Sequence, residues 1–257
     1  MIGFLIKKNF FDSWDNLFRL ALVNIGFIVS ISAPLFLPSL LADTPLLSIA
    51  VLILGILWCI VYLAAAAISI SSVSDYGSFG FADFFRNLKE VWPIGLAMAL
   101  ILFVGIILVM VIIPFYLELP NIIGVLLAAV IFWTIVVSIF SLQYFFAIRA
   151  RLDTKIIKII KKCYIIFFDN PMFSIFCFFH TLFQLILSIF LAFIFPGPAG
   201  VLLFIDESLR LRLLKYDWLE ENPEADRKKI PWDALLIDDR ERTGTRSLRN
   251  FIFPWKD

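Results

Sequence analysis

Long uninterrupted hydrophobic runs fill most of the chain and predict membrane-spanning helices. A helix needs about 20 predominantly apolar residues to cross the hydrocarbon core of a bilayer. Five segments meet this requirement: Leu20–Leu41, Leu46–Ile70, Pro93–Leu117, Ile122–Ala147 and Met172–Phe195. This pattern predicts an all-α, polytopic membrane helix bundle.

A sixth segment differs from the other five because charged residues interrupt it. The apolar stretch Gly197–Ile205 is too short to span a bilayer alone, and it follows a proline- and glycine-rich helix breaker. Asp206, Glu207 and Arg210 continue the same predicted helix. We interpret the segment as a short sixth span or half-span that returns to the starting side, which gives five or six transmembrane helices.

The distribution of lysine and arginine predicts the topology. Of 22 such residues, three precede the first span, two lie between the second and third, six lie between the fourth and fifth, and eleven follow from Arg210 onward. Cytoplasmic loops carry the excess of these residues. We therefore expect a cytosolic N-terminus. Its mixed charges, from Lys7 to Arg19, do not fit a cleavable signal peptide.

Two of the predicted inner loops have the pattern of amphipathic helices that lie at the membrane surface. In the first, apolar residues recur at helical spacing from Phe81 to Trp92, and charged residues occupy the other face. The second covers Thr154–Tyr164 and carries a basic face that is expected to contact anionic lipid. Its membrane-surface lysines are Lys155, Lys158, Lys161 and Lys162.

A weak internal repeat accompanies these loops. A charged, aromatic stretch with a phenylalanine pair precedes each odd-numbered span, at Phe10-Phe11, Phe84-Phe85 and Phe167-Phe168. The repeat predicts three hairpins, each with an interfacial helix before it. Chance is the alternative explanation, because the chain contains 29 phenylalanines.

Composition excludes a soluble enzyme. The chain is 61% hydrophobic and 17% charged, with a mean hydropathy of +0.95, whereas soluble domains are about 45–50% apolar and about 25% charged. The cysteines Cys59, Cys163 and Cys177 lack disulfide or metal-site spacing and are expected to be buried thiols. With one histidine and no phosphate-binding or hydrolase motif, we predict no catalytic residue, cofactor or metal.

Five polar residues within the apolar region are candidates for function. Asn24, His180 and Gln184 could line a path through the bilayer, or they could form interhelical hydrogen bonds that hold the bundle together. Asp206 and Glu207 could bind a proton or cation, or they could mark the inner membrane boundary, with Asp206 paired to the residue four positions later, Arg210. We favour the structural interpretation for both groups.

The predicted membrane domain, residues 1–214, is followed by a charged tail, residues 215–257. The tail contains two Pro-Trp pairs, and its candidate docking residues are Trp232, Phe253, Pro254 and Trp255. Buried tryptophan is a common anchor at interfaces. Two interpretations of these residues are open. They could dock on a partner, or they could anchor the tail to the lipid headgroups or to the protein's own inner face. Mixed charge does not favour nucleic acid as a partner.

Three stretches of the chain resemble the YesL-like family of bacterial polytopic membrane proteins. They are Leu22-Val23-Asn24 with the apolar run to Pro34, Phe81–Lys89, and Tyr144–Asp153 with the following basic helix up to Pro171. The chain departs from the family pattern in the turn after the first span and in its charged tail.

The resemblance implies a location in the bacterial cytoplasmic membrane and no known catalytic activity. It also implies an association with carbohydrate uptake, especially with sugar ABC importers. We therefore expect a non-enzymatic accessory protein whose partners are the lipid bilayer and the permease or ATPase subunits of such an importer. The alternatives are a transporter in its own right and a membrane scaffold or sensor that acts through the tail.

Overall fold

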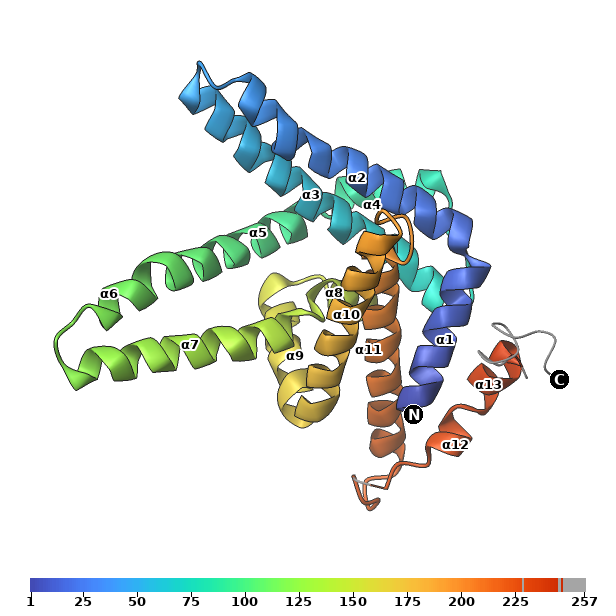
Figure 1. The fold of residues 1–257 in the computed structure, drawn as a ribbon. Helices are drawn as coiled ribbons and strands as arrows, with labels where there is room; N and C mark the ends of the chain where they lie inside the picture. The colour runs from blue at the N-terminus through green and yellow to red at the C-terminus, as the bar shows by residue number, and fades with distance from the viewer. Residues whose placement is uncertain (228, 245, 247–257) are drawn as a thin grey trace.

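The computed structural model describes residues 1–227, 229–244 and 246, and all regular elements in this part are helices. Five of them are long and apolar enough to cross a membrane, which confirms the predicted all-α, multi-pass fold. The long helices form three antiparallel hairpins (Figure 1). The first pairs α2 (Leu17–Leu40) with α3 (Pro45–Ser74). The second runs through α5 (Trp92–Ile107), the π-helical η1 (Leu108–Ile112) and α6 (Ile113–Leu117), and returns through α7 (Ile122–Leu142) and α8 (Phe145–Arg151). The third pairs α10 (Pro171–Phe190) with α11 (Gly197–Glu221).

A shorter helix precedes each hairpin, as the sequence repeat predicts. These helices are α1 (Ile2–Asp15), α4 (Phe81–Glu90) and α9 (Ile156–Asp169). Helix α4 begins where Asp83 Oδ2 accepts a hydrogen bond from Gly80 N at 3.1 Å, and α9 ends at the predicted Asn170-Pro171 break.

As a surface helix, α9 is expected to turn its apolar side toward lipid, and this holds only in part. Ile159, Cys163 and Ile166 are buried in the protein core instead of facing lipid, while Ile157 is 82% exposed. The helix therefore has one apolar face for the bundle and another for the bilayer.

Helices α2 and α3 approach closely because small residues lie where large ones meet them. A Cβ atom on Gly26 would lie 2.3 Å from Tyr62 Oη, and one on Gly55 would lie 2.8 Å from Pro34 Cβ. Only glycine fits at these contacts. Close approach at small residues is the usual mode of helix packing in membranes, where lipid competes with apolar side chains.

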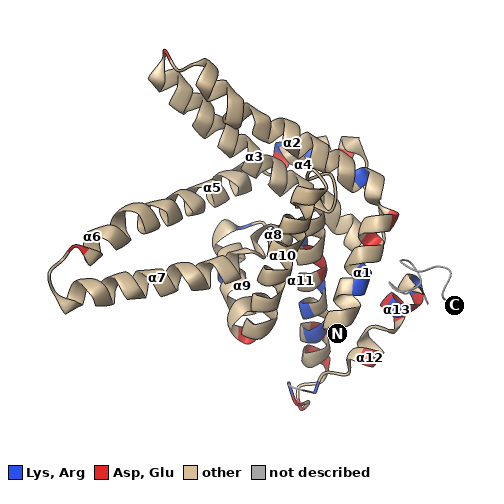
Figure 2. Cartoon of the chain, viewed as in Figure 1, with Lys and Arg blue, Asp and Glu red and all other residues tan. Residues whose placement is uncertain are grey.

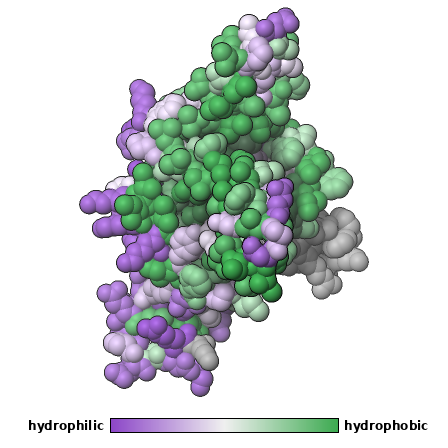
Figure 3. All heavy atoms as spheres, turned by 90° about the vertical axis from the view of Figure 1, so that its left-hand side faces the viewer, coloured by the Kyte–Doolittle hydropathy of each residue, from purple (hydrophilic) through white to green (hydrophobic). Residues whose placement is uncertain are grey.

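The second hairpin extends away from the rest of the protein (Figure 1). In the most apolar window of Trp92–Leu117 no residue is buried within the chain. Figure 3 shows hydrophobic residues over most of the face that the hairpins present. Such a surface requires a lipid environment. Pro114 follows the π-helical segment of this hairpin, and its missing N–H group accounts for the local change in helical hydrogen bonding.

The turn between α10 and α11 differs from the predicted one. The fifth span ends at Phe190 instead of Phe195, because the chain reverses through Ala192 and Phe193, both with positive φ. Gly197, with φ of +61°, then begins α11. A Cβ atom there would lie 2.3 Å from Asn24 Nδ2, so both the backbone angle and the space require glycine.

Helix α11 lies at the centre of the structure, in contact with α1, α2, α3, α8 and α10. It runs through the predicted domain boundary at residue 214 and ends at Glu221. Two short tail helices, α12 (Trp232–Leu235) and α13 (Ile237–Thr243), follow. Charged residues gather on α11, α1 and α13, whereas the extended hairpins carry very few (Figure 2).

Candidate functional site

Eight charged side chains around α11 form two neighbouring sets of ion pairs, which meet at Ser74 because Lys8 donates to its carbonyl oxygen and Arg151 to its hydroxyl. We call the two sets together the charge network. They come from α1, α8, α11, α13 and the end of α3. The members are Lys8, Asp12, Asp75, Arg151, Asp206, Glu207, Arg210 and Asp239.

Arg151 joins α8 to α11 and α3. Its Nε and Nη2 atoms donate to the two carboxylate oxygens of Asp206 at 2.9 and 2.6 Å, and its Nη1 donates to Asp75 Oδ2 at 3.0 Å. Nη2 also donates to Ser74 Oγ at 2.7 Å. The Asp206 side chain is 3% exposed and that of Arg151 is 13% exposed. The bidentate pair with Asp206 fixes the end of α8 to α11, and the contact with Asp75 adds the end of α3.

Arg210 connects the same group to the tail. Its Nη1 and Nη2 atoms donate to both Asp239 oxygens at 2.8 and 2.9 Å, and its Nε lies 3.2 Å from Asp75 Oδ1. The Tyr76 hydroxyl donates to Asp239 Oδ1 at 3.0 Å. Burial tends to raise the pKa of Asp239, but the hydrogen bonds and charge of Arg210 outweigh it and hold that pKa below its usual value. Asp239 is therefore an ionised clamp between α13 and α11.

The third part of the network lies between α1 and α11. Lys8 Nζ donates to Asp12 Oδ2 and, at 3.0 Å, to the carbonyl oxygen of Ser74, and it lies 3.6 Å from Glu207 Oε1. Neither carboxyl oxygen of Glu207 has a hydrogen-bond partner within the described ranges. Glu207 is therefore a buried carboxyl group whose nearest cation is Lys8 Nζ.

Asn24 forms the interhelical contacts that the structural interpretation predicts. Its Nδ2 donates to the carbonyl oxygens of Ile194 and Pro196, both at 2.9 Å, and its Oδ1 accepts from Ala199 N at 2.8 Å. Ser188 Oγ accepts from Gly197 N at 2.9 Å. Asn24 and Ser188 thus satisfy backbone groups at the start of α11 that the helix itself leaves unpaired.

His180 and Gln184 lie together on α10, away from Asn24. Gln184 Nε2 donates to Asn9 Oδ1 on α1 at 2.7 Å and lies 3.4 Å from His180 Nε2. The His180 ring packs on Phe204, with 4.2 Å between ring centroids. The three polar candidates therefore join α1, α2, α10 and α11 at separate points.

The predicted pairing within α11 is wrong. Asp206 pairs with Arg151 instead of Arg210, and Arg210 pairs with Asp239 and Asp75. The i,i+4 rule considers only neighbours on one helix surface. Here α11 is surrounded by other helices, which present better placed partners.

As far as it is described, the tail docks on the end of the bundle that carries the charge network. Leu236 is fully buried, Trp232 packs against the core around it, and the Arg212 guanidinium lies 5.6 Å from the Trp232 ring. Phe253, Pro254 and Trp255 lie outside the described residues.

The predicted surface lysines have different surroundings. Lys155, Lys158 and Lys161 are exposed, and Lys162 is half-buried with its Nζ 3.4 Å from Asp153 Oδ2. Their contact with anionic lipid stays a prediction.

In comparisons with known proteins, no family model, no curated protein and no solved structure matches this chain. The resemblance to the YesL-like family accordingly stays an expectation from the sequence. All three cysteines are buried as free thiols, as expected. Within the described ranges, no three His, Cys, Asp or Glu side chains are grouped so that they could hold a metal ion.

The sequence interpretation did not select several members of the charge network. Lys8 and Asp12 carried a usable signal, because opposite charges four residues apart share one helix face. Arg151 and Asp239 carried none, since their partners lie far away in sequence. Chemically, the network is suited to holding helices and tail in one arrangement.

Proposed function

We propose that this chain is a non-enzymatic accessory protein of a membrane transport system, with a carbohydrate ABC importer as the partner. The observation that carries the proposal is that polar side chains within the apolar helices form hydrogen bonds between helices. Asn24 is fully buried and Gln184 is 6% exposed, and both form hydrogen bonds that join helices. Groups engaged in this way support a structural role and not a path for a polar substrate.

Two further features support an accessory role. The resemblance in Phe81–Lys89 and the neighbouring stretches implies an association with carbohydrate uptake. In addition, the second hairpin extends from the rest of the chain with its apolar surface uncovered, so that the side chains of another membrane subunit can reach it (Figure 1).

The deciding experiment is a pulldown of the tagged full-length chain from membranes in mild detergent, with the captured proteins identified by mass spectrometry. We expect permease or ATPase subunits of an importer. As the contrasting measurement, the purified protein alone is reconstituted into vesicles and sugar uptake is followed. Uptake above that of empty vesicles, with no importer subunit captured, would contradict the accessory role and support a transporter.

A second candidate function is a membrane scaffold or sensor that acts through the tail. The observation in its favour is the Asp239–Arg210 clamp, an ionised pair that is one of the contacts holding α13 against α11. Breaking the clamp with Asp239→Asn should then change partner recovery in the same pulldown, while Asp238→Asn, at the exposed neighbouring position, should not.

A further inference from the structure

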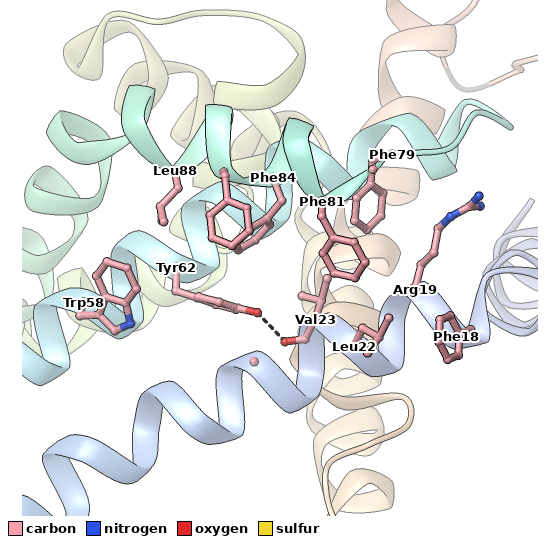
Figure 4. A pocket seen from close by; sticks show the side chains of 13 residues that line it. Phe18, Arg19, Leu22, Val23, Trp58, Tyr62, Phe79, Phe81, Phe84 and Leu88 are labelled. Atoms are coloured by element: carbon pink, nitrogen blue, oxygen red, sulfur yellow. Dashed lines mark hydrogen bonds between the residues drawn. The ribbon is translucent and has the colours of Figure 1, made fainter.

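A groove of about 490 Å³ lies between α4 and the first hairpin, apart from the charge network. Figure 4 shows α4 contributing Phe81, Phe84 and Leu88 to one side and α3 contributing Tyr62 to the other. Trp58 lies at one end of this row of side chains. The volume is within the range of about 300–1,000 Å³ that is usual for ligand sites.

Glycine shapes the groove. The Tyr62 ring can lie against α2 because Gly26 has no side chain, and the Tyr62 hydroxyl donates to the Val23 carbonyl oxygen at 2.8 Å. Phe84 packs on the same ring, with 5.0 Å between centroids. A mainly aromatic wall results, and it is fixed in place by a hydrogen bond that uses the tyrosine's polar atom.

The polar groups along the groove are largely engaged already. Besides the Tyr62 hydroxyl, the Trp58 Nε1 atom donates to Ser30 Oγ at 3.1 Å. A sugar would bury hydroxyl groups here without partners, which costs free energy. A hydrocarbon chain has no such requirement, so the lining favours an apolar occupant.

A cation lies at the end of the row opposite Trp58. Arg19 is exposed and donates from Nη1 to Asn16 Oδ1 at 3.1 Å, and no carboxylate of the described chain forms an ion pair with it. A guanidinium has five N–H donors, so most remain free for an anion. Phosphate groups match this donor geometry well.

The groove also has the right place in the fold. Arg19 lies in the first turn of the first span, at the predicted inner interface, and Phe81 and Phe85 on α4 are 64% and 59% exposed. An amphipathic helix with such aromatic residues lies at the boundary between headgroups and acyl chains. We propose that the groove binds one acyl chain of an anionic glycerophospholipid, with the lipid's phosphate group on Arg19.

Native mass spectrometry of the full chain tests the proposal, with phosphatidylglycerol or phosphatidylcholine of identical acyl chains added to the detergent. Wild-type protein should retain one phosphatidylglycerol in preference to phosphatidylcholine. Arg19→Gln should lower that retention by about tenfold, the order expected for lost charge-assisted hydrogen bonds. Leu22→Trp, which fills the groove, should abolish retention of both lipids.

Two control variants keep the outcome clear. Arg86→Gln removes an exposed cation from α4 that does not line the groove, and Leu100→Trp enlarges an exposed side chain elsewhere in the membrane region. Both should bind lipid as the wild type does. Retention that is equal for both lipids and unchanged in Arg19→Gln and Leu22→Trp would mean surface lipid only, and would overturn the proposal. An effect of Leu22→Trp without one of Arg19→Gln would overturn the headgroup assignment. A photo-reactive residue at Phe81 that cross-links to protein and not to lipid would overturn the choice of occupant.

Discussion

Replacing Arg151 with methionine tests whether the charge network holds the bundle together. The change removes the bidentate partner of Asp206, whose side chain is 3% exposed, and one partner of Asp75. An uncompensated buried charge is costly, and breaking such a pair destabilises a protein by about 3–5 kcal/mol. We expect Arg151→Met to lower the free energy of unfolding by this amount, measured by denaturant titration in detergent micelles with circular dichroism as the readout.

Two further variants separate the cost of the unpaired charge from other effects. Arg151→Met combined with Asp206→Leu should recover most of the loss, because an apolar replacement of a whole buried pair is often neutral. Arg86→Met makes the same chemical change in the exposed pair with Asp83 and should cost about 0–1 kcal/mol. If Arg151→Met is no more harmful than Arg86→Met, or if the double variant recovers nothing, the Arg151–Asp206 pair does not stabilise the fold.

The remaining predictions concern the tail, the start of α11 and the topology. Asp239→Asn should release α13 and speed cleavage of the tail in limited proteolysis, while Asp238→Asn should leave it unchanged. The pKa of Asp239 is lower in the folded chain than in the unfolded one. The stabilisation from the Asp239–Arg210 pair is therefore complete above the ordinary pKa of an aspartate and is lost as the pH falls through the folded pKa, so wild-type cleavage should rise only below about pH 4. A rise at neutral pH would contradict the clamp. Asn24→Leu should lower the free energy of unfolding by about 1–3 kcal/mol, because it leaves buried backbone groups unpaired, and an unchanged value would show that water or lipid replaces them. A cysteine at Ser39 should react with an impermeant reagent from outside and one at Lys158 only from inside; outside labelling at Lys158 would reverse the predicted topology.

The helices could be predicted from sequence because the requirement that produces them is local. A segment such as Pro45–Ser74 must satisfy its own backbone hydrogen bonds in lipid, and its apolar length shows this directly. The ends of the fifth span could not be predicted as well. Its turn depends on positive φ angles at Ala192 and Phe193, residues that seldom adopt them.

Site residues could be selected from the sequence only where a single polar residue stands out from its apolar neighbours. Asn24, Asp206 and Glu207 are conspicuous because polar groups are rare in apolar runs, and each of them is fully or almost fully buried in the structure. Their partners are not conspicuous. Arg151 stands among several basic residues near the end of a span, and only the fold shows that it pairs inward while Arg149 does not form a described ion pair. Charge alone does not distinguish a residue that faces lipid headgroups from one that enters the bundle.

The position of α11 explains how the network and the extended hairpins depend on each other. A helix with Asp206, Glu207, Arg210 and Arg212 could not face lipid at a tolerable cost, so it must be surrounded by protein. The C-terminal ends of α3 and α8, together with α1, provide that shield and the matching charges. Because these contacts fix the hairpins at one end only, the far part of the second hairpin stands away from the other described helices (Figure 1), and no residue in the most apolar window of Trp92–Leu117 is buried. A fixed end with an uncovered apolar arm would suit the proposed accessory role, since such an arm can contact another membrane protein without a change in the core of this one.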